Sequence, residues 1–149
     1  MAPDRRELLQ WASLLFLGVV SLAPRRASAA DEARAFAAGT LDDVIGALGG
    51  QPADSPQLSI AVPEFVENGA LVPVEIESRL PGAQTIFVVS ESNPYPLVAR
   101  FSIPEGTEPF VSTRIKVGAS CRVFAIVRAG ADLYWASRPT RVTVGGCGG

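Results

Sequence analysis

Short runs of β-forming residues, separated at close intervals by turn residues, constrain the fold of this chain more than any other feature. They extend from residue 57 to residue 144, and Pro, Gly and Asn divide them. The pattern predicts strands at residues 58–62, 71–78, 85–90, 97–103, 110–117, 120–128, 133–137 and 138–144. Such spacing is typical of an all-β fold. We therefore predict an immunoglobulin-like antiparallel β-sandwich of about seven strands over residues 57–144.

Three of these runs carry further information about the sheet. Residues 86–89 are all apolar, which predicts a strand buried on both faces. Pro73 interrupts the alternating run 71–78 and cannot donate a ladder hydrogen bond, so that run is predicted to be an edge strand or to carry a bulge. In the run 120–128, residues alternate between two faces. One face carries Cys121, Val123, Ala125 and Val127, and the other carries Arg122, Phe124, Ile126 and Arg128.

The segment before the strands, residues 31–56, predicts one or two short helices and a linker. Residues 31–39 are rich in helix formers and end in glycine. Thr40 is a candidate N-cap for an amphipathic helix over residues 41–48, which Gly49 would terminate. Residues 51–56 contain two prolines and are predicted to be a linker.

Residues 1–30 have the organisation of a cleaved signal peptide. Arg5 and Arg6 precede an apolar run over residues 8–23, and small residues at 27–30 offer a cleavage site. The paired arginines resemble a twin-arginine export signal, so we expect the mature protein to be free in the periplasm. Removing these residues takes away four of the 13 basic and two of the 15 acidic residues, which leaves a formal net charge of −4. That charge disfavours binding to nucleic acid or to an anionic membrane.

The chain contains no histidine, which removes the usual neutral-pH general base and the Ser-His-Asp and Cys-His nucleophile pairs. Its two cysteines are far apart in the sequence, so no zinc or iron–sulfur ligand set is evident. Glu75 and Glu77 share one strand face, and a solvated face is the simplest interpretation of them. We predict no catalytic residue, no metal site and no cofactor in this chain.

The thiol of Cys147 is the one chemically reactive group that is left. It lies in the last five residues, where Gly145 and Gly146 precede it and Gly148 and Gly149 follow it. Glycines bury no side chain and favour a flexible arm. A thiol there is a modest nucleophile until a partner's pocket activates it, which favours a covalent carrier over a catalyst. Two alternatives stay open: a disulfide from Cys147 to Cys121, and disulfide-linked dimers through Cys147.

The ending Gly145-Gly146-Cys147-Gly148-Gly149 is similar to the C-terminus of the SoxY family, the sulfur-carrier subunits of the bacterial thiosulfate-oxidising Sox system. Residues 41–50, 67–74, 93–97, 103–109 and 142–144 also resemble that family. The resemblance implies that Cys147 holds sulfur intermediates covalently and that the glycines supply reach and access. It gives Cys121 no role.

The resemblance also implies partners. A SoxZ-like subunit would form a heterodimer with this chain and would be exported with it. A thiosulfate-coupling haem protein, a sulfate-releasing hydrolase and a sulfane dehydrogenase would act in turn on the cargo. Two other functions are alternatives: a ubiquitin-like carrier that uses the terminal Gly148-Gly149 as a thiocarboxylate, and a periplasmic interaction module whose Cys147 only crosslinks dimers.

Overall fold

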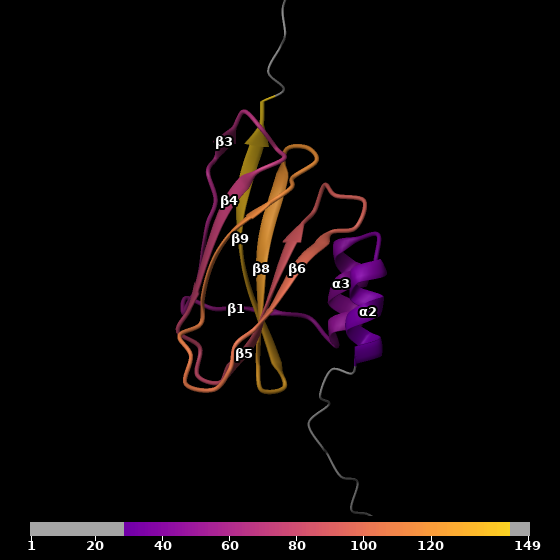
Figure 1. The fold of residues 1–149 in the computed structure, drawn as a ribbon. Helices are drawn as coiled ribbons and strands as arrows, with labels where there is room; N and C mark the ends of the chain where they lie inside the picture. Colours follow the sequence, from indigo (N-terminus) through magenta and orange to yellow (C-terminus); the bar gives the residue numbers. More distant parts are fainter. Residues whose placement is uncertain (1–28, 144–149) are drawn as a thin grey trace, which may run out of the picture.

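The computed structural model describes residues 29–143, in which two sheets face each other and a helical hairpin covers the outer side of one of them (Figure 1). The elements are, in order, α2 (Ala29–Ala37), α3 (Leu41–Leu48), β1 (Ala53–Asp54), β2 (Leu58–Ala61), β3 (Phe65–Val66), β4 (Val72–Ser78), β5 (Ala83–Ser90), β6 (Leu97–Ser102), β7 (Phe110–Ile115), β8 (Cys121–Ala129) and β9 (Asp132–Val142). The predicted β-sandwich with short N-terminal helices is confirmed.

The last strand, β9, is an inner strand of the larger sheet. That sheet has the order β1-β9-β8-β5-β6, and β3 also pairs with β9; the smaller sheet has the order β2-β4-β7. The pairs β8–β9, β5–β8 and β5–β6 are antiparallel. The short strands β1 and β3 both pair with β9 in parallel, near its beginning and near its end. Segments from early in the chain therefore hold the outer side of β9.

A hydrophobic core fills the space between the two sheets. In β4, every second residue points into it, and Val72, Val74 and Ile76 are completely buried. Valines of β8 meet them from the opposite sheet. Burying one such side chain stabilises the fold by about 1.5–3 kcal/mol, so this alternation determines which face of each strand points inward.

A second core lies between the larger sheet and the helical hairpin. Phe87 of β5 and Ile126 of β8 are fully buried there, against Val44 and Leu48 of α3. The run 86–89 is thus buried on both faces, as predicted. The two faces predicted for residues 120–128 are also confirmed, since the Val123 face borders the inter-sheet core and the Phe124 face borders the helices.

The hairpin has its own polar connections. Thr40 caps α3: its Oγ1 accepts a hydrogen bond from the Asp43 amide at 3.1 Å, as the capping pattern predicted. At the other end of α3, the Arg128 guanidinium donates to the Leu48 carbonyl at 2.7 Å. Burial lowers the pKa of Arg128 below its usual value, and the charge of Glu32 opposes that shift. The result is a charged side chain that satisfies a helix C-terminus beneath the hairpin.

The structure corrects three details of the predicted strands. The runs 133–137 and 138–144 form one strand, β9, and two-residue strands that were not predicted, β1 and β3, lie in the linker and before residue 67. β4 is the central strand of its sheet, so its prediction as an edge strand was wrong, and its register with β7 has no bulge. Pro73, however, has no paired residue in β2, because the last pair between β2 and β4 joins Ala61 to Glu75. The missing amide donor of Pro73 therefore deprives no β2 residue of a hydrogen bond.

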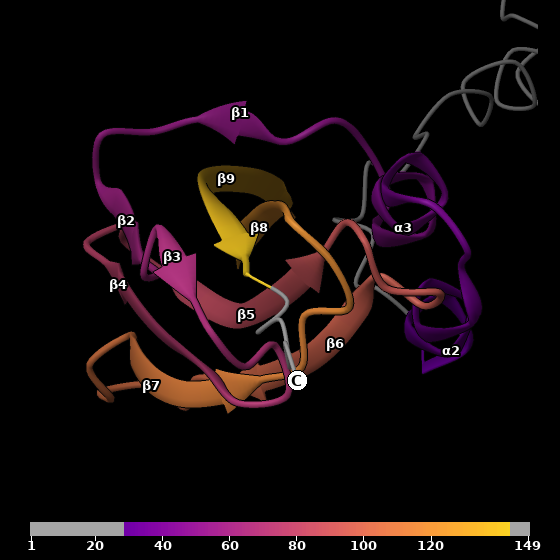
Figure 2. The ribbon, with the colours of Figure 1, turned by 90° about the horizontal axis from the view of Figure 1, so that it is seen from above.

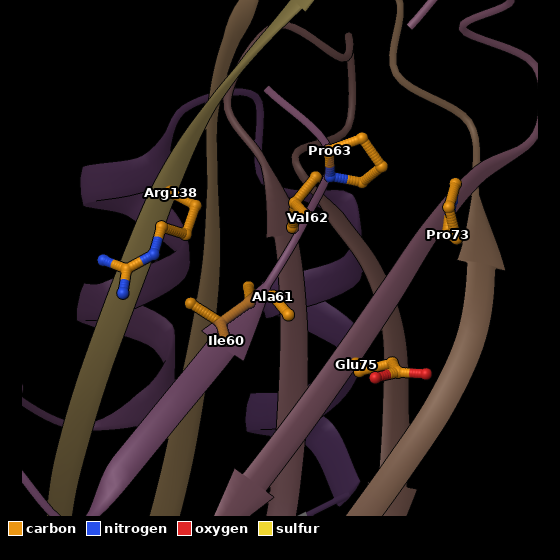
Figure 3. Close-up of a pocket in the computed structure, with 7 residues that line it drawn as sticks. All are labelled: Ile60, Ala61, Val62, Pro63, Pro73, Glu75 and Arg138. Atoms are coloured by element: carbon orange, nitrogen blue, oxygen red, sulfur yellow. The ribbon is translucent and has the colours of Figure 1, made fainter. Parts of the chain in front are cut away.

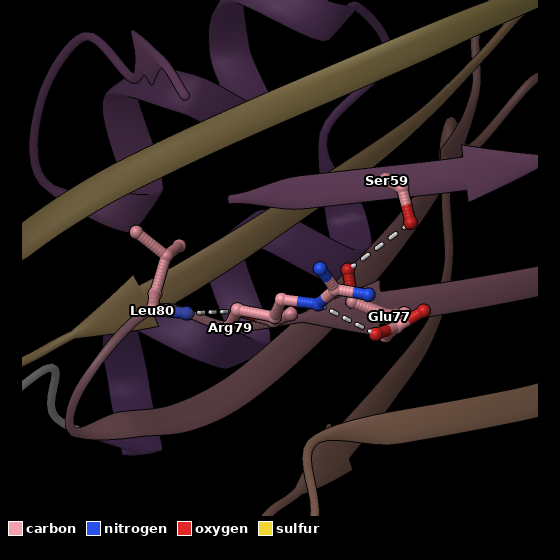
Figure 4. Close-up of polar contacts among 5 residues, drawn as sticks. Ser59, Glu77, Arg79 and Leu80 are labelled. Atoms are coloured by element: carbon pink, nitrogen blue, oxygen red, sulfur yellow. Dashed lines mark hydrogen bonds and ion pairs between the residues drawn. The ribbon is translucent and has the colours of Figure 1, made fainter. Parts of the chain in front are cut away.

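The carboxylates of β4 lie on the outer side of the smaller sheet, as predicted. Glu77 Oε1 accepts from Arg79 Nε at 2.9 Å, and the Glu77 carbonyl accepts from Ser59 Oγ at 3.5 Å (Figure 4). Glu75 is exposed and lies near Ser112 of the neighbouring strand. Their surroundings are those of a solvated sheet face. Within residues 29–143, neither helix is long and apolar enough to span a bilayer.

Candidate functional site

The predicted attachment residue and its glycines lie outside the described residues. Cys147, Gly145, Gly146, Gly148 and Gly149 follow the last described residue, Thr143, and the export arginines Arg5 and Arg6 precede the first. What the structure describes is the place where the chain leaves the sandwich towards Cys147. The candidate site is therefore built from the end of β9 and the connections around it.

The end of β9 is held on both sides. Towards β3, the Arg141 amide donates to the Glu64 carbonyl at 2.7 Å, and the Thr143 amide donates to the Val66 carbonyl at 2.9 Å. On the opposite side, just before β8 begins at Cys121, Ser120 Oγ accepts from the Val142 amide at 3.0 Å. This side-chain contact continues the ladder one step beyond β8. The chain is thus fixed up to four residues before Cys147.

Gly69 allows the connection before β4 to approach the connection between β7 and β8. The Gly69 carbonyl accepts from the Val117 amide at 2.7 Å. A Cβ at residue 69 would lie 2.3 Å from the Val117 carbonyl oxygen and 3.3 Å from the Val142 side chain. Only glycine fits this approach without a backbone shift. One residue therefore joins two connections to the end of β9.

The connection between β5 and β6 is tied to the same region through two side chains. Asn93 Nδ2 donates to the Lys116 carbonyl and its Oδ1 accepts from the Gly118 amide, both at 2.8 Å. Ser92 Oγ accepts from the Ala119 amide at 3.1 Å and donates to the Ala119 carbonyl at 3.0 Å. Such hydrogen bonds take the place of a regular ladder between loops.

Together these connections, residues 63–71, 91–96 and 116–120, form what we call the arm-end rim. Viewed from above, β3 and the connection from β7 to β8 surround the end of β9 (Figure 2). From the sequence, residues 67–69, 92–96 and 118 were predicted only as separate turns, and residues 71, 116, 117 and 120 were predicted to belong to strands. Their turn composition was visible, but their meeting at one end depends on strand order, which the residues alone did not give.

Cys121, the other cysteine, faces inward beside this rim. It is partly buried, packs against the inter-sheet core, and pairs with Thr140 of β9. Its Sγ lies 3.7 Å from the Oγ of Ser90, which is fully buried. Cys121 forms no disulfide with any described residue. Cys121 thus shares the inward face with Val123, as the alternation of residues 120–128 predicted, although part of the residue is accessible.

Elsewhere the described residues offer little for chemistry. Within residues 29–143, no group of three or more Cys, Asp and Glu side chains is arranged to hold a metal ion. A groove of about 600 Å³ lies between β2, β4 and β9, with the charged side chains Glu75 and Arg138 at its sides (Figure 3). The remaining lining residues are apolar or proline: Ile60, Ala61, Val62, Pro63 and Pro73. This groove contains no nucleophile and no paired acid and base.

Comparisons with known proteins identify relatives of the whole domain. Residues 44–147 match the family model described as sulfur oxidation protein SoxY. The solved structure of the sulfur carrier protein SoxY from Chlorobium limicola f. thiosulfatophilum is 35% identical over 77% of this chain and 100% of that chain, with a TM-score of 0.63. No curated protein sequence matches the chain.

Two other solved structures are more distant. A superoxide reductase (neelaredoxin) from Ignicoccus hospitalis is 20% identical over 58% of this chain and 80% of that chain, with a TM-score of 0.47. The human F-spondin reeler domain is 13% identical over 64% of this chain and 96% of that chain, with a TM-score of 0.38. Neither bears on the function of this chain.

Proposed function

The chain belongs to the SoxY family of sulfur oxidation proteins, and we propose that it is a periplasmic carrier that holds thiosulfate-derived sulfur covalently on Cys147. The observation that carries the proposal is the extent of the family match, which runs to residue 147 and so includes this cysteine. The match continues past the last strand, β9, which ends at Val142. The hydrogen-bonded end of β9 supports the same proposal, because it fixes the position from which the chain continues towards Cys147 and its cargo.

The proposed chemistry begins with an oxidative coupling. The Cys147 sulfur forms a bond to the outer sulfur of thiosulfate, the thiol proton goes to solvent, and two electrons pass to a haem protein. Hydrolysis of this adduct then releases sulfate and leaves the remaining sulfur on Cys147. A dehydrogenase would oxidise that sulfur further. In this scheme the chain supplies the attachment point and its presentation, and its partners supply the turnover.

The partner proposed for this chain is a SoxZ-like subunit in a heterodimer. Among the described strands, β6 and β7 each pair with a single neighbour, so each has a free edge. Free strand edges are sites where another β-protein can add a strand. Export by the twin-arginine route is part of the same proposal, since it moves a folded protein together with its partner.

Intact-mass analysis tests the carrier. Protein from the periplasm of thiosulfate-grown cells should carry sulfonate or polysulfane adducts on Cys147, and Cys147→Ser should lose them. Cys121→Ser is the matched control and should keep them. A small β-rich subunit should co-purify, and its absence would contradict the heterodimer. Adducts confined to Cys121, or disulfide-linked dimers without any adduct, would instead favour the interaction module.

A further inference from the structure

The arm-end rim exposes three large apolar side chains. Phe65, Leu71 and Tyr95 have exposed fractions of 59%, 65% and 64%. Within residues 29–143, the other large apolar side chains exposed to a comparable degree are Phe36 on α2 and Phe110 on β7. Single exposed apolar residues are ordinary on protein surfaces. Three of them on the connections at one end of the sandwich are less ordinary.

These side chains lie at the end where the chain leaves towards Cys147. Phe65 is paired in register with Arg141, two residues before Thr143. Leu71 directly precedes Val72, which pairs with Ile115 at the same end. Tyr95 belongs to the connection that Ser92 and Asn93 tie to residues 116–119, as described above.

Phe110 lies at the opposite end of the sandwich. It pairs with Glu77 near the far end of β4, whereas Val72 begins β4 beside the rim. Phe36 lies on the helical hairpin and not on the rim. An exposed aromatic residue away from the rim is therefore available as a control.

The short segment between Thr143 and Cys147 limits how far from the rim a partner that encloses Cys147 can lie. Cys147 is four residues beyond Thr143, and four extended residues span at most about 14 Å. A macromolecule that surrounds the Cys147 sulfur must therefore approach Thr143 to within about that distance. The rim begins beside Thr143, whose amide donates to the Val66 carbonyl, so the entrance of such a partner would approach it.

We propose that the arm-end rim is the docking face for an enzyme that modifies Cys147, with Phe65, Leu71 and Tyr95 as its apolar contacts. This inference rests on the proposed carrier function. The enzyme it requires has its reacting centre at the end of a channel no deeper than about 14 Å and an apolar entrance. Large apolar and aromatic side chains provide most of the binding energy in many protein interfaces.

The polar contacts of the rim fit such a role. Charged residues of both signs lie on and beside the rim: Glu64, Glu67, Glu91, Lys116 and Arg141. The rim therefore has no field of a single sign to steer a partner. The hydrogen bonds through Gly69 and Asn93 join its connections into one surface. A surface that is already ordered loses less conformational entropy when a partner binds.

Steady-state coupling kinetics test the proposal. The mature chain, with its partner subunit, is the substrate of the host's thiosulfate-coupling haem protein, and intact mass follows adduct formation on Cys147. In Phe65→Ser/Leu71→Ser/Tyr95→Ser, the KM for the carrier should rise about tenfold or more while kcat is kept. Phe36→Ser should behave as the unsubstituted protein. If the triple variant does not fold, Tyr95→Ser alone should still raise the KM severalfold.

A second readout separates docking from thiol reactivity. The rate at which a small aromatic disulfide modifies Cys147 should be equal in all folded variants. The docking proposal is overturned if the rim variants keep the KM of Phe36→Ser, or if the reagent rate falls in parallel with coupling. Absence of any adduct on the unsubstituted protein would instead refute the carrier function itself, so the two failures are distinguishable.

Discussion

Replacing Gly69 by alanine tests how the base of the C-terminal arm is held. The new Cβ would lie 2.3 Å from the Val117 carbonyl oxygen, a backbone atom that cannot rotate away. An ordinary contact needs about 1 Å more, so one of the two connections must move. That movement would stretch the 2.7 Å hydrogen bond from the Val117 amide to the Gly69 carbonyl.

The expected loss of stability combines three contributions. Overpacking costs about 1–3 kcal/mol, and a lost hydrogen bond costs about 0.5–1.5 kcal/mol. Alanine also restricts the unfolded chain, which returns about 0.4–1 kcal/mol. The free energy of unfolding should therefore fall by about 0.5–4 kcal/mol. For a domain of this size, about 4 °C of Tm accompanies each kcal/mol.

Scanning calorimetry of the mature protein measures this change. Gly39→Ala is the matched control, because a Cβ added at residue 39 would have no neighbouring atom within 4 Å and the φ of this glycine is not positive. The control should be neutral or slightly more stable. We expect the Tm of Gly69→Ala to lie about 2–16 °C below that of the unsubstituted protein. Equal Tm values for the two variants would refute the idea that the close approach at Gly69 requires glycine.

Two further predictions concern the helical hairpin. Arg128→Met leaves the Leu48 carbonyl without its charged donor, and we expect urea unfolding to show a loss of about 1–3 kcal/mol; a gain would mean that the desolvation of Arg128 costs more than its contacts provide. Thr40→Ala removes the cap that accepts from the Asp43 amide, and should lower the free energy of unfolding by about 1 kcal/mol, measured by the same method. Thr40→Ser should retain most of that stability, and an equal loss in both variants would contradict the capping role.

Features that depend on neighbouring residues were predictable from the sequence. The capped helix α3 has its signals within ten residues, from Thr40 to Gly49. The buried strand β5 is evident from four consecutive apolar residues. In β8, alternation identified both faces, although the sequence did not reveal that the hairpin covers the face of Phe124 and Ile126.

Features that depend on pairing between distant segments were not predictable in this way. The strands β1 and β3 have two residues each and exist through their pairing with β9. The runs 133–137 and 138–144 were predicted as two strands, yet β9 continues through both and through Pro139. In the described structure Pro139 lies between the β1 and β3 pairings, where β9 has a neighbour only on the β8 side. The arm-end rim was missed for the same reason, since Gly69 and Asn93 become neighbours of residues 116–118 only after the sheets form.

The inner position of β9 also has a consequence for biosynthesis. A chain that stops before Asp132 leaves β8 paired only with β5 and leaves β1 and β3 without any strand to pair with. Because pairings with distant segments form late, folding of the larger sheet must wait for the last part of the chain to be made. Val142 ends β9 five residues before Cys147. A chain that ends before β9 is complete therefore lacks both Cys147 and a complete larger sheet.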